Sequence, residues 1–109
     1  MLEELLEFLN NKKILILGFG LEGRASYNFL RRYFKDLKLY IADQKEFEMD
    51  IENKNNQNYE SNIRLKNDIE KNLVKLNIGE KYLDNLEDYD LILKTPGLSF
   101  NDIDISKIE

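Results

Sequence analysis

Residues 12–23 have the sequence Lys-Lys-Ile-Leu-Ile-Leu-Gly-Phe-Gly-Leu-Glu-Gly, a short apolar run followed by three spaced glycines. The run from Lys12 to Gly18 predicts a strand buried on both faces of a parallel sheet. The next segment, Arg24 to Lys35, has apolar residues at helical spacing and predicts a helix. We expect that helix to bury one face, formed by Ala25, Phe29, Leu30, Tyr33 and Phe34. Strand, glycine turn and helix in this order are typical of the first unit of an α/β fold.

The rest of the chain continues this alternation. A second strand is predicted at 37–43, and the Glu-, Lys- and Asn-rich stretch from Gln44 to about Asn62 predicts a solvated, weakly ordered loop. The other predicted elements are an amphipathic helix at 1–11, a helix from 63 followed by a strand at 72–78, a short helix at 81–87 and a strand at 88–94. We therefore predict an α/β, Rossmann-like, doubly wound and mostly parallel sheet of four or five strands with flanking helices. Residues 1–109 are expected to form one domain.

The composition excludes several kinds of site. The chain has no cysteine and no histidine, which removes thiolate chemistry, disulfides and the commonest metal ligand and general base. Its net charge of −5 argues against nucleic-acid binding, and no run of about 18 apolar residues predicts a membrane span. These features favour a cytoplasmic monomer without a metal site or catalytic residues of its own.

The glycine turn is the first candidate ligand site. Gly18, Gly20 and Gly23 have the spacing Gly-x-Gly-x-x-Gly, and they lie between a predicted strand and a predicted helix. In that position, glycines let the backbone approach a diphosphate, and the first N–H groups of the helix point at the anion. The alternative is that the glycines only permit close packing of helix against strand.

Two further turns are expected at the same edge of the sheet. Asp43 ends the second strand, where folds of this class place an acid against a ribose or base; alternatively, it only starts a turn. Thr95-Pro96-Gly97 follows the last strand and forms a turn suited to present the Gly97 N–H and the Thr95 hydroxyl to a phosphate or sugar, or it is a plain Pro-Gly turn. Arg24 and Lys45 are secondary phosphate candidates, because a single surface cation is usually just solvated.

Three motifs together resemble the Mur ligase family. They are Gly-Phe-Gly-Leu-Glu-Gly-Arg-Ala-Ser-Tyr from Gly18, Ile-Ala-Asp ending at Asp43, and Leu-Ile-Leu-Lys-Thr-Pro-Gly-Leu from Leu91. The resemblance spans about residues 12–99. It implies that the chain is an N-terminal domain that binds the UDP part of UDP-N-acetylmuramoyl-L-alanine, to which the parent enzyme adds D-glutamate during peptidoglycan synthesis. It also implies that the parent enzyme uses ATP and Mg²⁺ bound by further domains.

The resemblance assigns roles to particular residues. The diphosphate is expected near the glycine turn and the Pro-Gly turn, and uracil near the strand-end acid. The UDP-binding residues implied are Gly18, Gly20, Leu21, Glu22, Gly23, Asp43, Gln44, Lys45, Thr95, Pro96 and Gly97. This sequence departs from the family at Glu22, where many members have Ser or Thr, and at Gln44-Lys45, where a small polar residue and Arg are usual. Glu22 is therefore expected to contribute its backbone N–H and to direct its side chain to water.

The isolated chain is expected to bind without catalysing. No Gly-x-x-x-x-Gly-Lys-Ser/Thr phosphate loop occurs in the 109 residues, so the chain is interpreted as a fragment of a multidomain ligase. One alternative is an NAD(H)-binding regulatory or dehydrogenase domain, which uses the same glycine fingerprint. Another is an interaction module whose α/β scaffold binds no nucleotide.

Overall fold

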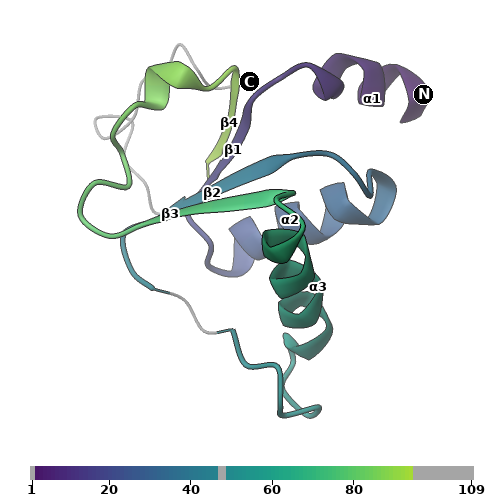
Figure 1. Cartoon of the computed structure of the whole chain (residues 1–109), viewed down its shortest axis with the longest axis vertical. Helices are drawn as coiled ribbons and strands as arrows, with labels where there is room; N and C mark the ends of the chain where they lie inside the picture. The colour runs from purple at the N-terminus through teal and green to yellow at the C-terminus, as the bar shows by residue number, and fades with distance from the viewer. Residues whose placement is uncertain (1, 47–48, 95–109) are drawn as a thin grey trace.

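The computed structural model describes residues 2–46 and 49–94 of the chain, which form four strands and three α-helices (Figure 1). The strands are parallel neighbours in the order β3-β2-β1-β4. In chain order the elements are α1 (Leu2–Asn10), β1 (Ile14–Leu17), α2 (Leu21–Tyr33), β2 (Leu39–Asp43), α3 (Tyr59–Glu70), β3 (Val74–Ile78), the 3₁₀ helix η1 (Leu86–Asp88) and β4 (Leu91–Lys94). The prediction of an α/β Rossmann-like fold is confirmed.

The strand order places a switch in direction beside β1. The chain moves outward from β1 to β2 and β3, and it then crosses back so that β4 lies on the other side of β1. All four residues of β1 are buried, as expected for a central strand covered on both faces. In open α/β sheets, ligands bind outside the carboxyl ends of the strands at such a switch.

Different segments cover the two faces of the sheet. On one face, Tyr27 and Leu30 of α2 and Leu65 of α3 pack against Ile14, Ile16 and their neighbours. The other face is covered by the segment between β3 and β4. Its residues Tyr82, Leu83, Leu86 and Tyr89 pack against Leu15, Leu17, Tyr40, Ala42 and Ile92. The hydrophobic core is thus divided between the two faces of the sheet.

The prediction of which α2 residues are buried is partly wrong. Leu30 and Phe34 are buried, but Ala25 is exposed and the side chains of Phe29 and Tyr33 are 53% and 44% exposed. Three other residues, Arg24, Tyr27 and Arg31, are buried instead. The helix is rotated toward α3 because two of its arginines and one tyrosine are hydrogen-bonded to that helix. Apolar spacing does not reveal such polar contacts.

The predicted loop ends earlier than expected. Helix α3 begins at Tyr59, so Ser61 and Asn62 are helical and buried rather than solvated. The loop before it contains local turns in which side chains accept hydrogen bonds from the backbone. Asp50 Oδ1, for example, accepts from the N–H groups of Glu52 and Asn53 at 2.9 and 3.1 Å, and these bonds lower the pKa of its carboxyl group.

Two smaller predictions had different outcomes. The N-terminal helix is confirmed as α1, although among its side chains from Glu3 onward only Leu9 is buried. The short helix predicted at 81–87 is wrong, because turns precede a single 3₁₀ turn at Leu86–Asp88. Asn85 interrupts the segment with a left-handed φ of 62°, and Leu86 anchors it to the sheet.

Candidate functional site

The glycine turn begins where β1 ends. Gly18 has a φ of +91°, a conformation that favours glycine, and its N–H donates to the carbonyl oxygen of Ala42 at 2.7 Å. Phe19 is buried, and Gly20 is the N-cap of α2. The backbone therefore turns sharply at the carboxyl edge of the sheet and enters a helix directly.

The first turn of α2 is open to solvent. Leu21 is 83% exposed, Glu22 is exposed, and the N-cap residue Gly20 has no side chain with which to cap the helix. The first helical hydrogen bond runs from the Arg24 N–H to the Gly20 carbonyl at 2.9 Å. The earlier N–H groups are of the kind that bind anions at helix starts, and the exposed acid Glu22 is favourable there for the same electrostatic reason.

Gly20 has no reason within the described fold to be glycine. Its φ of −76° is accessible to any L-residue, and a Cβ atom built on it would meet nothing within 4 Å. Close packing between helix and strand, the alternative interpretation of the glycines, does not account for this position. Among residues 2–46 and 49–94, no atom occupies the space directly in front of Gly20, so these residues leave room there for a ligand.

Asp43 is joined directly to the glycine turn. Its Oδ2 accepts a hydrogen bond from the Phe19 N–H at 2.7 Å, and its Oδ1 accepts one from the Lys45 N–H at 3.1 Å. Asp43 therefore both stabilises the turn after β2 and lies beside the glycine turn. Because each carboxylate oxygen has two lone pairs, Asp43 keeps acceptor capacity for a ligand donor. Gln44 and Lys45 follow it and are exposed.

The third predicted turn, Thr95-Pro96-Gly97, lies outside the described residues. The strand that leads to it is described: β4 pairs with β1 so that Lys94 is the register partner of Leu17. Both strands therefore end at the same level of the sheet, with Leu17 followed at once by the glycine turn.

A small, largely apolar cavity of about 320 Å³ lies at the same edge. It is lined by Glu46, Met49, Leu76 and Ile78. Ile78 is the register partner of Asp43, so this cavity adjoins the strand-end acid on the outer side of β2. Its size and lining suit one flat ring. The sequence interpretation missed it, since its residues come from two segments that the sheet brings together.

Arg24 is not the solvated cation that the sequence suggested. Its side chain is 7% exposed and donates from one terminal nitrogen to Ser61 Oγ at 3.1 Å and to Asn62 Oδ1 at 2.6 Å. Its guanidinium carbon lies 4.9 Å from the centre of the Phe19 ring. Arg24 therefore links the glycine turn to the first turn of α3. Asn62 in turn donates a hydrogen bond to the Asp50 carbonyl at 2.8 Å, which joins α3 to the preceding loop.

A second buried polar group joins α2 to α3 further along. Asp68 accepts hydrogen bonds at the same oxygen from the Tyr27 hydroxyl and from Arg31 Nε, the latter at 2.8 Å. Burial, and then the bond to Asp68, raises the pKa of the Tyr27 hydroxyl. This group stabilises the helix pair. No signal in the apolar pattern distinguishes Asp68 from a surface acid.

Residues 2–46 and 49–94 lack two further features, a membrane-spanning helix and a cluster of metal ligands. No helix in these ranges has the length and apolar character required to cross a membrane. Within the same ranges, no group of three or more acidic side chains is gathered closely enough to hold a metal ion.

Comparison with known proteins finds similarity to one ligase. UDP-N-acetylmuramoylalanine–D-glutamate ligase of Clostridium beijerinckii is 34% identical over 97 residues, which cover 87% of this chain and 18% of the ligase. The ligase of the same name from Acetivibrio thermocellus is 28% identical over 97 residues, covering 85% of the chain and 17% of that protein. That of Clostridium acetobutylicum is 26% identical over 95 residues, covering 87% and 18%. No family model and no solved structure matches.

These matches cover most of the chain and a small part of each relative. The chain spans about 18% of the length of the curated ligases it matches, and it resembles that part of them. The three motifs that carried the sequence resemblance are consistent with this result.

Proposed function

We propose that this chain binds the UDP part of UDP-N-acetylmuramoyl-L-alanine at the carboxyl edge of its sheet. The observation that carries the proposal is the space that the described residues leave open at Gly20, where α2 begins without an N-cap side chain and beside Asp43. Similarity to ligases whose name contains UDP-N-acetylmuramoylalanine supports the choice of nucleotide. The chain thus takes a role in peptidoglycan-precursor synthesis.

In this proposal the diphosphate approaches the N–H groups at the start of α2. The helix terminus contributes about 0.3–1 kcal/mol for an exposed anion and up to about 2 kcal/mol when the anion is partly buried. Further contacts are therefore needed. Asp43 supplies an acceptor for uracil or ribose donors, the cavity beside Ile78 offers an apolar wall to the base, and Thr95–Gly97 contacts the phosphates or sugar.

The amide-bond chemistry belongs to the longer ligase in this proposal. ATP and Mg²⁺ would be bound by domains outside these 109 residues, whose sequence contains no Gly-x-x-x-x-Gly-Lys-Ser/Thr loop. The substrate carboxylate is activated there as an acyl phosphate, which the amine of D-glutamate then attacks. On this proposal the chain alone binds the nucleotide weakly and does not catalyse, because other domains of the longer ligase also hold the substrate.

A titration followed by ¹H–¹⁵N NMR tests the proposal. We expect UDP-N-acetylmuramoyl-L-alanine and UDP to shift the amide signals of Gly18–Gly23 and Asp43–Lys45, with saturation at high ligand concentration. NADH should shift none of them. Equal shifts with NADH would favour the NAD(H)-binding alternative, and no shift with any nucleotide would favour a pure interaction module.

A further inference from the structure

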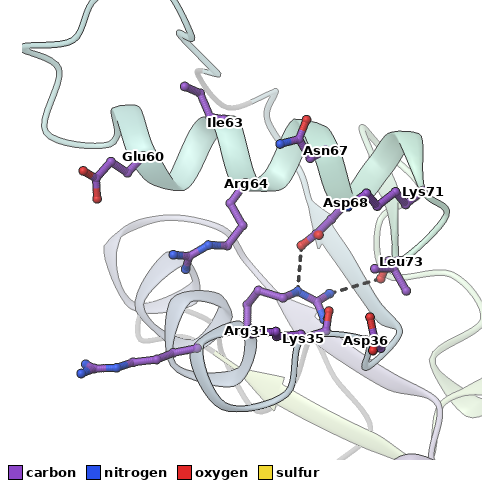
Figure 2. Close-up of a pocket in the computed structure, with 11 residues that line it drawn as sticks. Arg31, Lys35, Asp36, Glu60, Ile63, Arg64, Asn67, Asp68, Lys71 and Leu73 are labelled. Atoms are coloured by element: carbon purple, nitrogen blue, oxygen red, sulfur yellow. Dashed lines mark hydrogen bonds and ion pairs between the residues drawn. The ribbon is translucent and has the colours of Figure 1, made fainter.

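A second hollow lies between α2 and α3, away from the glycine turn (Figure 2). This interhelical groove has a volume of about 610 Å³, which is within the usual range for small-molecule sites. Its walls come from the last turn of α2, the segment that follows it, and one face of α3. Arg31 lies eleven residues beyond Gly20 along α2, or about 16 Å at the rise of an α-helix. The groove is therefore separate from the proposed nucleotide site.

The groove is basic in an acidic protein. The whole chain has 21 acidic and 16 basic residues, but five basic and only three acidic residues line the groove. Two of these, Arg31 and Asp68, form a buried ion pair and cancel each other. The exposed remainder is four cations, Arg32, Lys35, Arg64 and Lys71, against two acids, Asp36 and Glu60.

The floor of the groove is rigidly built. Arg31 is 5% exposed, and one of its terminal nitrogens donates to the carbonyl oxygens of Phe34, Lys35 and Leu37 at 2.9, 3.0 and 2.7 Å. Its Nε is held by Asp68 at 2.8 Å, as the dashed line in Figure 2 shows. These hydrogen bonds hold Arg31 in place and join the end of α2 to the segment that follows it.

The exposed cations come from α2 and α3 and from the residues directly after each helix. Figure 2 shows the side chain of Arg64 extending from α3 toward α2, and Lys71 is the C-cap residue directly after α3. No described carboxylate forms an ion pair with Arg64 or Lys71. A guanidinium presents a planar fork suited to phosphate or carboxylate oxygens, and ammonium groups add point charges around it.

We propose that the interhelical groove binds a small multivalent oxyanion, a phosphate ester or a polycarboxylate, with Arg64 and Lys71 as principal contacts. Arg32 and Lys35 supply the opposite wall, so the ligand lies between the two helices. Ile63 and Asn67 give the site one apolar and one neutral polar contact. This proposal does not depend on nucleotide binding at the glycine turn.

Titration of the 109-residue chain with sodium tripolyphosphate and with citrate, followed by ¹H–¹⁵N NMR, tests the groove. We expect saturable shifts at Arg32, Arg64, Asn67 and Lys71, which persist when UDP is present and weaken as salt is added. The double variant Arg64→Gln/Lys71→Gln should bind roughly tenfold more weakly or worse, since it loses two charge-assisted contacts.

A matched control separates a site from general charge. Lys66→Gln/Lys75→Gln removes the same charge from exposed positions outside the groove, and it should retain wild-type affinity. Shifts confined to Gly18–Gly23, binding without saturation, or equal weakening by both double variants would overturn the proposal. All four substituted side chains are exposed, so the variants should unfold at the wild-type temperature.

Discussion

At Gly20, the glycine is explained by neither backbone angle nor packing among the described residues. The substitution Gly20→Ala should change the free energy of unfolding by less than about 1 kcal/mol, because alanine is a poorer N-cap but restricts the unfolded chain. The same variant should lose affinity for UDP-N-acetylmuramoyl-L-alanine, since the new methyl group occupies the space in front of the turn. Urea unfolding and calorimetric titration measure the two effects separately.

Gly79 provides the contrasting control. Its φ is +116°, so Gly79→Ala should lower the free energy of unfolding by about 1–2 kcal/mol or more, although its Cβ would also meet nothing within 4 Å. Wild-type nucleotide affinity in a well-folded Gly20→Ala variant would contradict the proposed path of the diphosphate.

Arg24 is the residue whose surroundings differ most from the sequence expectation. Replacement by Met keeps a long apolar stem but leaves Ser61 and Asn62 without the guanidinium that bonds them. We expect Arg24→Met to lower the free energy of unfolding by about 2 kcal/mol or more, and Arg24→Lys to recover only part of it. Urea denaturation checks both values. A Met variant as stable as wild type would mean that the side chain is solvated.

At the scale of elements, the contact between α2 and α3 depends on a polar group as well as on apolar packing. Asp68 bonds both Tyr27 and Arg31, and the side chains of Arg31 and Asp68 are only 4% and 9% exposed. A buried charge that loses its partner is far more costly than a pair replaced together by apolar residues. The helix pair should therefore respond differently to single and double substitutions.

We expect Asp68→Asn to lower the free energy of unfolding by about 3–5 kcal/mol, because it leaves the buried guanidinium of Arg31 unpaired. The double variant Arg31→Met/Asp68→Leu should cost less than the sum of its two single changes. Asp36→Asn removes the same charge from an exposed residue of the groove and should change stability by no more than about 0.5 kcal/mol. Additive effects in chemical denaturation would show that the pair is not coupled.

For the whole molecule, the buried Tyr27 hydroxyl makes stability depend on alkaline pH. Its pKa is raised in the folded chain, first by burial and then by Asp68, so the unfolded chain releases this proton more readily. The protonated Tyr27 hydroxyl contributes its full share to the free energy of unfolding below about pH 10, the ordinary pKa of tyrosine. This share declines as the pH rises beyond that value. The free energy of unfolding should therefore fall between about pH 10 and 11.

The variant Tyr27→Phe should show a shallower alkaline decline than wild type. Tyr89, whose pKa is also raised by burial, provides the comparison, because Tyr89→Phe should remove a smaller part of the decline. Denaturant titrations at about pH 9, 10 and 11, roughly one unit on each side of the ordinary tyrosine pKa, measure the slopes. An identical slope in wild type and Tyr27→Phe would show that this hydroxyl does not couple to folding.

Local sequence patterns were sufficient to predict the order of the strands and helices, and to predict the glycine turn and Asp43 as parts of the candidate site. The apolar run before Gly18, the helical spacing after Gly23 and the acid at Asp43 predict strand, turn, helix and strand. The structure joins the glycine turn to the end of β2, because the Phe19 N–H donates to the Asp43 carboxylate. Such signals are local because each depends on residues within one element or one turn.

Tertiary structure alone decided which charged residues are buried and where the cavities lie. Arg24, Arg31 and Asp68 have the composition of a solvated helix surface, yet they are bonded across 37 or more positions of the chain. Periodicity reports which side chains avoid water, but a buried charge is stable only if distant partners satisfy its hydrogen bonds. Those partners are brought together by the packing of α3 on α2, and no single segment of the sequence encodes that contact.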